Sequence, residues 1–189
     1  MESAVVRYLN SWVGEFTIID FVMGIIVSDY AIPVIGSLIL VSLWFSGNDR
    51  DRHFNQAITL IGTGSIGISN LITSIINVRV DRARPFVENE LNLLFYEPTD
   101  PSFPSNAAAV GFAIATCVVL KHRKTGGLLY VLAFGWGFAR IYAGVHYPTD
   151  VIGGALIGVA ATFIVAGIFR LFIYIPKKIH IAFRLFYLA

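Results

Sequence analysis

Long apolar runs separated by short polar stretches dominate the pattern along this chain of 189 residues. A helix that crosses the apolar core of a bilayer needs about 20 mostly apolar residues, because each residue adds only about 1.5 Å of length. Five segments approach this length and carry few charges, so we expect each to be a membrane-spanning helix. The pattern therefore predicts an all-α, polytopic membrane helix bundle that forms a single domain over 1–189. The five segments are 31–46, 54–78, 105–120, 127–145 and 150–173.

The N-terminal segment, 1–28, leaves two structures open. Its second half is apolar, but Arg7, Asn10, Glu15 and Asp20 interrupt the segment. Such a segment either lies along the membrane surface as an amphipathic helix or enters the membrane only in part. We expect an interfacial helix or a partial span here.

The composition agrees with a membrane protein. Hydrophobic residues make up 56% of the chain and charged residues 14%, whereas charged residues are about 25% of typical soluble domains. A soluble protein of this size could not cover so much apolar surface, which excludes a simple cytosolic enzyme. The single cysteine, Cys117, excludes an intramolecular disulfide and a zinc site built on paired cysteines. The net charge of +2 gives no indication of a nucleic-acid partner.

The positions of Lys and Arg predict how the bundle is oriented. These residues gather at 50–52, 121–124 and 177–184, which fall on one side of the membrane if the five spans alternate. Lys and Arg accumulate on the cytoplasmic side of membrane proteins. We therefore expect the tail, 176–189, to be cytoplasmic and the long loop, 79–104, to be extracytoplasmic.

Three stretches of polar residues stand at span ends on the extracytoplasmic side. They read VRVDRARPF at 78–86, PSFPSNAAA at 101–109 and ARIYAGVHYPTD at 139–150. They lie far apart in the sequence, but the alternating topology brings all three to the same membrane face.

These stretches contain the groups that bind a phosphate. A guanidinium is always charged and offers forked donors that match phosphate oxygens. Arg84 is part of a dense arginine cluster, and Arg140 lies in an apolar helix, where a charge usually faces a partner or a polar cavity. Ser105 opens a helix, and the free N–H groups of a helix N-terminus favour an anion. A plain N-cap is the other interpretation of Ser105.

His146 and Asp150 suggest the chemistry. They are four residues apart across a Pro-Thr turn, so the carboxylate can hold one ring nitrogen and leave the other free as a nucleophile or base. The alternative is an interfacial histidine beside a helix-capping aspartate. We expect neither a metal nor a cofactor, since His53, His122 and His180 lie on the other face.

The order and spacing of these residues resemble the type 2 phosphatidic acid phosphatase superfamily, which also includes vanadium haloperoxidases and glucose-6-phosphatase. The family pattern is KxxxxxxRP, then PSGH, then SRxxxxxHxxxD. In this chain the first motif reads NVRVDRARP at 77–85, the second PSNA at 104–107 and the third ARIYAGVHYPTD at 139–150. The third motif is highly specific and the first moderately so.

The resemblance implies a metal-independent lipid phosphatase. His146 would attack phosphorus and form a phosphohistidine, and Asp150 would orient His146. The substrate would be a lipid phosphate or pyrophosphate, with undecaprenyl pyrophosphate favoured and phosphatidylglycerophosphate or phosphatidate left open. The enzyme would lie in a bacterial inner membrane with its site on the extracytoplasmic face. The phosphate would be held by Arg84, Ser105, Asn106 and Arg140.

The chain departs from the family pattern where it matters for catalysis. Asn77 replaces the family lysine, whose charge would have to come from Arg79 or, more weakly, Arg82. Ala107 stands where the family has the histidine that protonates the leaving oxygen. The loss of a general acid costs about 10²–10⁴ in rate, so we expect severely reduced activity. Our hypothesis is an inactivated variant of an active enzyme, and the alternative is a catalytically dead lipid-phosphate-binding protein or small lipid transporter.

Overall fold

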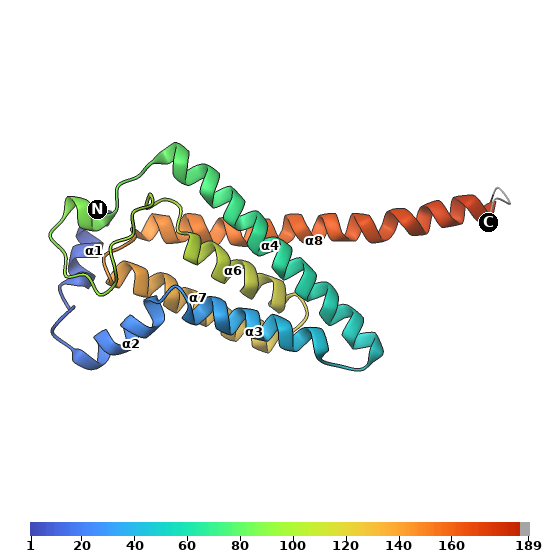
Figure 1. Cartoon of the computed structure of the whole chain (residues 1–189), viewed down its shortest axis with the longest axis horizontal. Coiled ribbons are helices and arrows are strands. Elements are labelled where there is room, and N and C mark those ends of the chain that lie inside the picture. The colour runs from blue at the N-terminus through green and yellow to red at the C-terminus, as the bar shows by residue number, and fades with distance from the viewer. Residues whose placement is uncertain (186–189) are drawn as a thin grey trace.

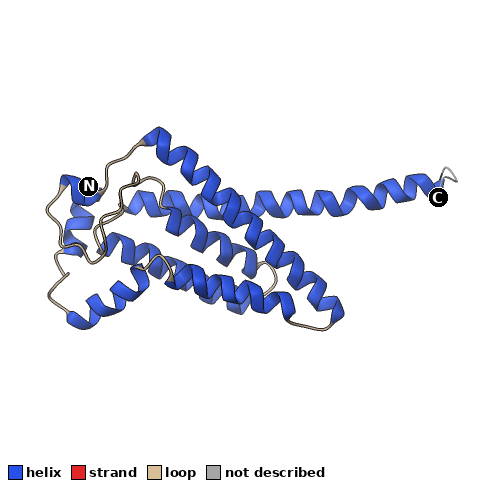
Figure 2. Cartoon of the chain, viewed as in Figure 1, coloured by secondary structure: helices blue, strands red, loops and turns tan. Residues whose placement is uncertain are grey.

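The computed structural model describes residues 1–185, with side chains described for 1–48 and 51–172. Within this range every regular element is a helix, which confirms the all-α prediction (Figure 2). In chain order the helices are α1 (Glu2–Asn10), α2 (Thr17–Val27), α3 (Ala31–Phe45), α4 (Asp49–Val80), α5 (Pro85–Glu88), α6 (Asn106–Val119), α7 (Arg123–Tyr142) and α8 (Pro148–Leu185).

Helix α6 is the centre of the bundle (Figure 1). It contacts α3, α4, α7 and α8, and ten of its 14 residues are buried. Its tight contact with α8 depends on glycine: a Cβ added at Gly154 would lie 2.2 Å from the carbonyl oxygen of Ser105. A Cβ at Gly158 would lie 2.2 Å from the carbonyl oxygen of Ala109. Small residues of this kind let helices approach closely in membranes, so they fix the start of α6 against the start of α8.

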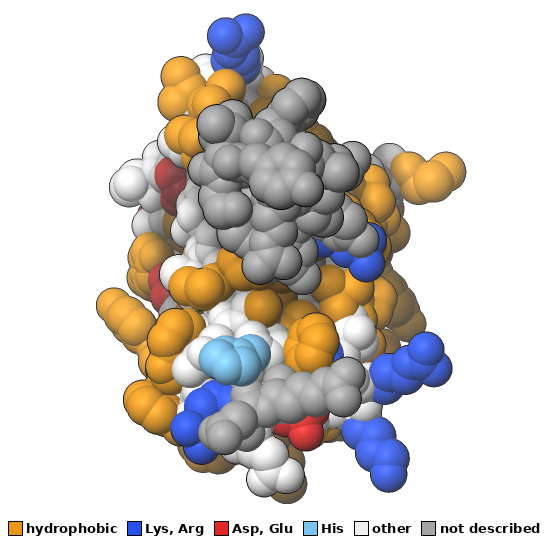
Figure 3. All heavy atoms as spheres, turned by 90° about the vertical axis from the view of Figure 1, so that its right-hand side faces the viewer, with side chains coloured by type: hydrophobic (Ala, Val, Ile, Leu, Met, Phe, Trp, Pro, Cys, Tyr) orange, Lys and Arg blue, Asp and Glu red, His pale blue; other side chains and the backbone are white. Residues whose placement is uncertain are grey.

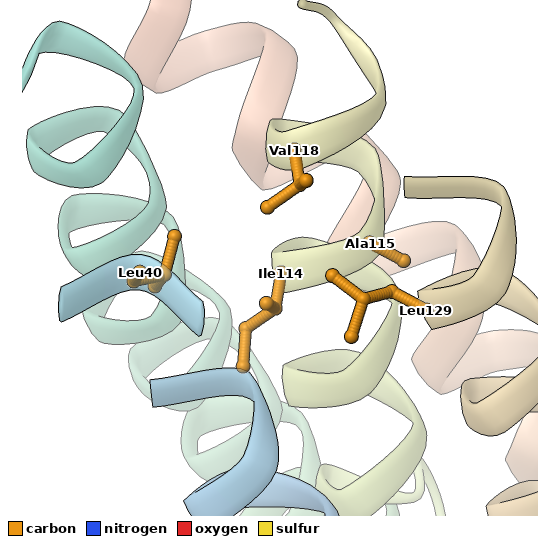
Figure 4. Close-up of a cluster of buried hydrophobic side chains, with 5 residues drawn as sticks. All are labelled: Leu40, Ile114, Ala115, Val118 and Leu129. Atoms are coloured by element: carbon orange, nitrogen blue, oxygen red, sulfur yellow. The ribbon is translucent and has the colours of Figure 1, made fainter. Parts of the chain in front are cut away.

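A cluster of buried apolar side chains holds the other half of α6 in place (Figure 4). It joins α3, α6 and α7. The position of α6 is therefore fixed at both ends, by backbone contact with α8 at one and by side-chain packing at the other. The cluster consists of Leu40, Ile114, Ala115, Val118 and Leu129.

Length and composition identify fewer candidate spans than the five predicted. By length and composition, two helical stretches among the described residues can cross a membrane, Asp51–Glu88 and Pro148–Phe172. The pair Thr17–Val27 and Ala31–Phe45, which is bent by 52°, makes a third if it forms one span. Helix α6 has 14 residues and is thus about 21 Å long, shorter than the roughly 30 Å apolar core of a bilayer. The count of five is not confirmed.

The ambiguous N-terminal segment folds into α1 and α2, and its polar residues make specific contacts. The Asn10 amide donates to the carbonyl oxygens of Asn92, at 2.9 Å, and of Tyr142, at 3.0 Å. Asp20 accepts a hydrogen bond of 2.7 Å from the Tyr142 hydroxyl. These polar side chains tie the segment to α7 and to the long loop. That the segment is interfacial or a partial span stays a prediction.

The two ends of the bundle carry different groups. The connections that hold the three polar stretches lie at the end where the N-terminus is found (Figure 1). The α3–α4 and α6–α7 connections lie at the other end, and Figure 3 shows Lys and Arg side chains among hydrophobic ones on that face. The predicted cytoplasmic tail, 176–189, falls outside the residues whose side chains are described.

Candidate active site

A cavity of about 440 Å³ opens at the end of the bundle where the polar stretches meet. It is lined by residues of α3, α4, α6 and α7 and by the connections that precede α3, α6 and α8. Each of the three sequence motifs contributes to its wall, so the expected convergence of distant segments is seen in the structure. The predicted site residues in the wall are Arg84, Asn106, Ala107, Arg140 and His146.

The imidazole of His146 has a defined tautomer. Its Nδ1 lies 2.9 Å from the carbonyl oxygen of Ser102, and because a carbonyl only accepts, Nδ1 carries the proton. Its Nε2 therefore carries the lone pair, which accepts a hydrogen bond of 3.3 Å from Nη1 of Arg84. The side chain is only 4% exposed. Burial lowers the pKa of His146, and the charges of Arg84 and Arg140 lower it further, while Asp150 opposes the shift.

This environment predicts that His146 is neutral at pH 7. Lowering the pKa of a histidine favours its neutral form, so protonation should occur only below the ordinary value of about 6.5. An NMR titration of the histidine ring resonances in detergent measures this, and the His146→Gln variant assigns the signal. A midpoint above 6.5 would show that burial does not control the charge of this ring.

Ser102 connects His146 to Asp150. The Asp150 carboxylate is fully buried, and its Oδ2 lies 3.7 Å from Nδ1 of His146, which is too far for a direct hydrogen bond. The Ser102 hydroxyl donates to this Oδ2 at 2.5 Å, and the Tyr147 N–H donates to it at 2.7 Å. Asp150 thus reaches the imidazole mainly through Ser102. Ser102 is not among the residues predicted from the sequence, although it stands within the PSFPS stretch.

Arg84 is held rigidly at the cavity wall. Its Nε donates to the carbonyl oxygen of Asp100 at 2.8 Å, and its Nη2 forms an ion pair of 2.9 Å with the Asp100 carboxylate. Its Nη1 donates to the carbonyl oxygen of Val145 at 2.9 Å. The side chain is only 5% exposed. These contacts fix the guanidinium beside Nε2 of His146, where a phosphoryl group would arrive.

Arg140 approaches the cavity from α7. Its Nη2 forms an ion pair with the carboxylate of Asp29, which lies between α2 and α3. Its guanidinium carbon lies 4.7 Å from the ring centre of Phe95 and 5.6 Å from that of Trp136. Stacking of this kind is favourable for a guanidinium and keeps it in place. Arg84 and Arg140 therefore present two fixed positive charges to the same cavity.

The N-terminus of α6 forms another part of the wall. Ser105 is the N-cap, and its hydroxyl accepts a long hydrogen bond of 3.5 Å from the Ala108 N–H. The Asn106 side chain accepts a hydrogen bond of 2.9 Å from Thr73 and lines the cavity together with Ala107. Residue 107 thus faces the site, but its methyl group offers no proton.

Four predicted residues, Asn77, Arg82, Ser105 and Asp150, are not part of the cavity wall. The Asn77 amide donates to the carbonyl oxygens of Pro101, at 3.1 Å, and Phe103, at 2.8 Å, so it supports the segment that leads into α6. Arg82 forms ion pairs with Asp150, at 2.7 Å, and Glu2, at 2.5 Å. Neither residue lines the cavity that holds His146. Arg79, the other proposed substitute for the family lysine, is exposed at the end of α4.

The cavity wall also contains polar atoms that lack partners. Among the described residues, three buried side-chain atoms make no hydrogen bond: Oδ1 of Asn70, Nε1 of Trp136 and Nε of Arg140. All three residues line this cavity. Buried polar groups are nearly always paired, so their presence here is typical of a pocket that receives a polar ligand.

Comparison with known proteins identifies relatives of the whole bundle. The model of the PAP2 superfamily matches residues 59–174. The chain is 31% identical over 148 residues to a protein of Bacillus subtilis named undecaprenyl-diphosphatase BcrC. This match covers 78% of the chain and 74% of the relative.

Solved structures show the same arrangement of helices. The structure of LpxE from Aquifex aeolicus matches with a TM-score of 0.67 and 27% identity, over 87% of this chain and 93% of the other. A transmembrane PAP2-type phosphatidylglycerolphosphate phosphatase from Bacillus subtilis matches with a TM-score of 0.64 and 25% identity, over 88% and 83% of the two chains. The match to the family model, together with these relatives and structures, places this chain in the PAP2 superfamily.

Proposed function

We propose that the chain has the site of a lipid phosphatase that removes a phosphate from a lipid phosphate or pyrophosphate. The observation that carries the proposal is the meeting of Arg84, Arg140 and Nε2 of His146 in one cavity. Undecaprenyl pyrophosphate is the favoured substrate, since the relative named undecaprenyl-diphosphatase matches most of the chain. Phosphatidylglycerophosphate is the second choice, on the basis of the matching structure of that phosphatase.

In the proposed reaction His146 is the nucleophile. Its Nε2 lone pair forms a bond to phosphorus while the bond to the leaving oxygen breaks, which gives a phosphohistidine. The Ser102 carbonyl holds the Nδ1 proton, so the ring attacks in one tautomer. Arg84 and Arg140 stabilise the charge on the phosphoryl oxygens. Water then attacks phosphorus, the bond to Nε2 breaks, and inorganic phosphate leaves with His146 restored.

At position 107 the chain lacks a group that can protonate the leaving oxygen. Ala107 lines the cavity but cannot protonate the departing oxygen. A lipid alkoxide is a poor leaving group without a proton, whereas the phosphate released from a pyrophosphate leaves more easily. The chain is therefore proposed to have severely reduced activity, and the reduction should be smaller for a pyrophosphate than for a phosphate monoester.

The orientation of the bundle supports a site on the extracytoplasmic face of a bacterial inner membrane. The α6–α7 connection and the start of α7, which carry Lys121, Arg123 and Lys124, lie at the end opposite the cavity. At the cavity end, Arg82, Arg84 and Arg140 each pair with a carboxylate, so these arginines belong to the folded site. The basic end is then the cytoplasmic one. In this proposal α3, α4, α6, α7 and α8 are the five spans.

Oxyanion binding tests the proposed function directly. Orthovanadate should bind the purified chain, and Arg140→Gln should weaken binding by about tenfold or more, because a charged hydrogen bond is lost. Arg123→Gln removes an equal charge at the other end of the bundle and should change nothing. Titration calorimetry in detergent measures all three proteins. Equal affinities for the two variants would show that the anion binds elsewhere. That result would favour the alternative of a small lipid transporter that lacks this site.

A further inference from the structure

Asp29 forms an ion pair with Arg140, the arginine whose guanidinium is proposed to bind the substrate phosphate. It lies between α2 and α3, lines the cavity, and forms an ion pair with Nη2 of Arg140. Its other oxygen accepts a hydrogen bond of 2.8 Å from the Tyr96 hydroxyl. The side chain is 38% exposed, whereas that of Arg140 is 5% exposed. One carboxylate thus joins the N-terminal segment and the long loop to the buried arginine.

The pairing of Arg140 with Asp29 is incomplete. Asp29 contacts Nη2, while the buried Nε of Arg140 has no hydrogen-bond partner. A guanidinium binds carboxylates and phosphates with the same forked donors, so the two anions compete for one edge. A phosphate that used Nε and Nη2 together would satisfy the orphaned donor. It would also bring two negative charges together unless Asp29 moved away.

Arg84 differs from Arg140 in this respect. All three of its nitrogen atoms donate hydrogen bonds, and two of the acceptors are the backbone carbonyls of Asp100 and Val145. Loss of the Asp100 carboxylate would leave these backbone contacts in place. Its partner is also 64% exposed, so its charge is more strongly screened. The competition with substrate is therefore concentrated at Asp29.

The position of Asp29 in the chain is independent of the catalytic motifs. It precedes residues 59–174, which match the family model, and it stands at the 52° bend between α2 and α3. Asp20, which lies on α2, accepts a hydrogen bond from Tyr142 and does not line the cavity. The chain before α3 thus brings one carboxylate, Asp29, into the cavity and keeps another, Asp20, outside it.

We propose that Asp29 is a placeholder for the substrate phosphate on Arg140, and that its negative charge sets how tightly the site holds an oxyanion. Asp29 is a specificity-determining residue in this scheme. Its charge disfavours strongly charged anions more than weakly charged ones, and an entering phosphate must displace it. The inference rests on the proposed function, because it takes Arg140 as a phosphate-binding group.

The Asp29→Asn variant tests the inference. Asparagine has the same shape but carries no charge: its amide oxygen can accept from Arg140, while its NH2 group donates to the Tyr96 oxygen. Orthovanadate should bind Asp29→Asn about tenfold more tightly than the parent chain, and the gain should be larger for inorganic pyrophosphate than for inorganic phosphate. Asp20→Asn removes the same charge from the same segment and should bind as the parent does. Titration calorimetry in detergent gives each affinity.

The outcomes separate this inference from the proposed function. If the parent binds vanadate and Asp29→Asn binds equally or more weakly, Asp29 only positions Arg140 and the placeholder role is wrong. If the parent and Asp29→Asn both fail to bind any of the three anions, the proposed function fails as well. A thermal melt by circular dichroism shows whether the asparagine variant is folded. If it is not, Asp29→Ser replaces it, and this variant is also expected to bind orthovanadate more tightly than the parent chain.

Discussion

Ala107→His is expected to raise the rate of phosphate release from a lipid pyrophosphate by about 10²–10⁴-fold. Residue 107 lies on the first turn of α6 and lines the same cavity as His146. An imidazole at this position would supply the proton that the leaving oxygen needs. The increase should be larger for phosphatidate than for undecaprenyl pyrophosphate, because an alkoxide depends more on protonation than a phosphate does.

Phosphate release from both lipids, measured in detergent micelles, gives the size of this effect. Ala107→Asn is the matched control, since its amide is polar and of similar size but is no acid. It should stay close to the parent chain. If Ala107→His remains inactive on undecaprenyl pyrophosphate, phosphatidylglycerophosphate and phosphatidate, the chain is better described as a lipid-phosphate-binding protein.

In the Ala107→His protein, a further His146→Gln change is expected to lower turnover by about 10⁴-fold or more. Glutamine has no ring nitrogen that can form the bond to phosphorus, so the covalent route is lost. His122→Gln serves as the control, because His122 bonds to Asn55 at the other end of the bundle. The initial rate of phosphate release reports both changes. Activity within tenfold of the starting protein for His146→Gln would assign the nucleophile to another residue.

The sequence alone predicts much of the bundle. The predicted span 31–46 and the helix Ala31–Phe45 agree to one residue at the C-terminal end, and 105–120 differs from Asn106–Val119 by one residue at each end. The start of α4 is missed by five residues. Its first turns contain Asp51, Arg52 and His53, and hydropathy does not distinguish a polar helical turn from a loop.

The motifs predict the cavity, but they do not reveal its supporting contacts. Arg84, Arg140 and His146 could be assigned because guanidinium and imidazole groups have strong chemical preferences of their own. Asp29 and Ser102 gain their roles from residues 111 and 44 positions away in the chain. Only the folded structure brings such pairs together, and a serine or an exposed aspartate gives no local signal of its partner.

Contacts that only the folded structure reveals also explain the polar residues of the N-terminal segment. Asn10 and Asp20 make the segment a poor membrane span when only its hydropathy is considered. In the structure these side chains bind Tyr142 and the backbone of the long loop. Polar residues that find partners inside the protein no longer oppose burial. Their presence therefore reflects contacts with α7 rather than contact with water.

Identification of the phosphorylated residue during turnover tests the central claim most directly. Ala107→His protein is mixed with a substrate carrying a ³²P-labelled terminal phosphate and is denatured within the first turnover. The protein is then digested under alkaline conditions, which preserve phosphohistidine. We expect the label on the peptide that contains His146, and its absence when His146→Gln is added. Label on any other residue, or steady turnover with no labelled protein at any time point, would contradict a cavity in which Nε2 of His146 attacks a phosphate held by Arg84 and Arg140.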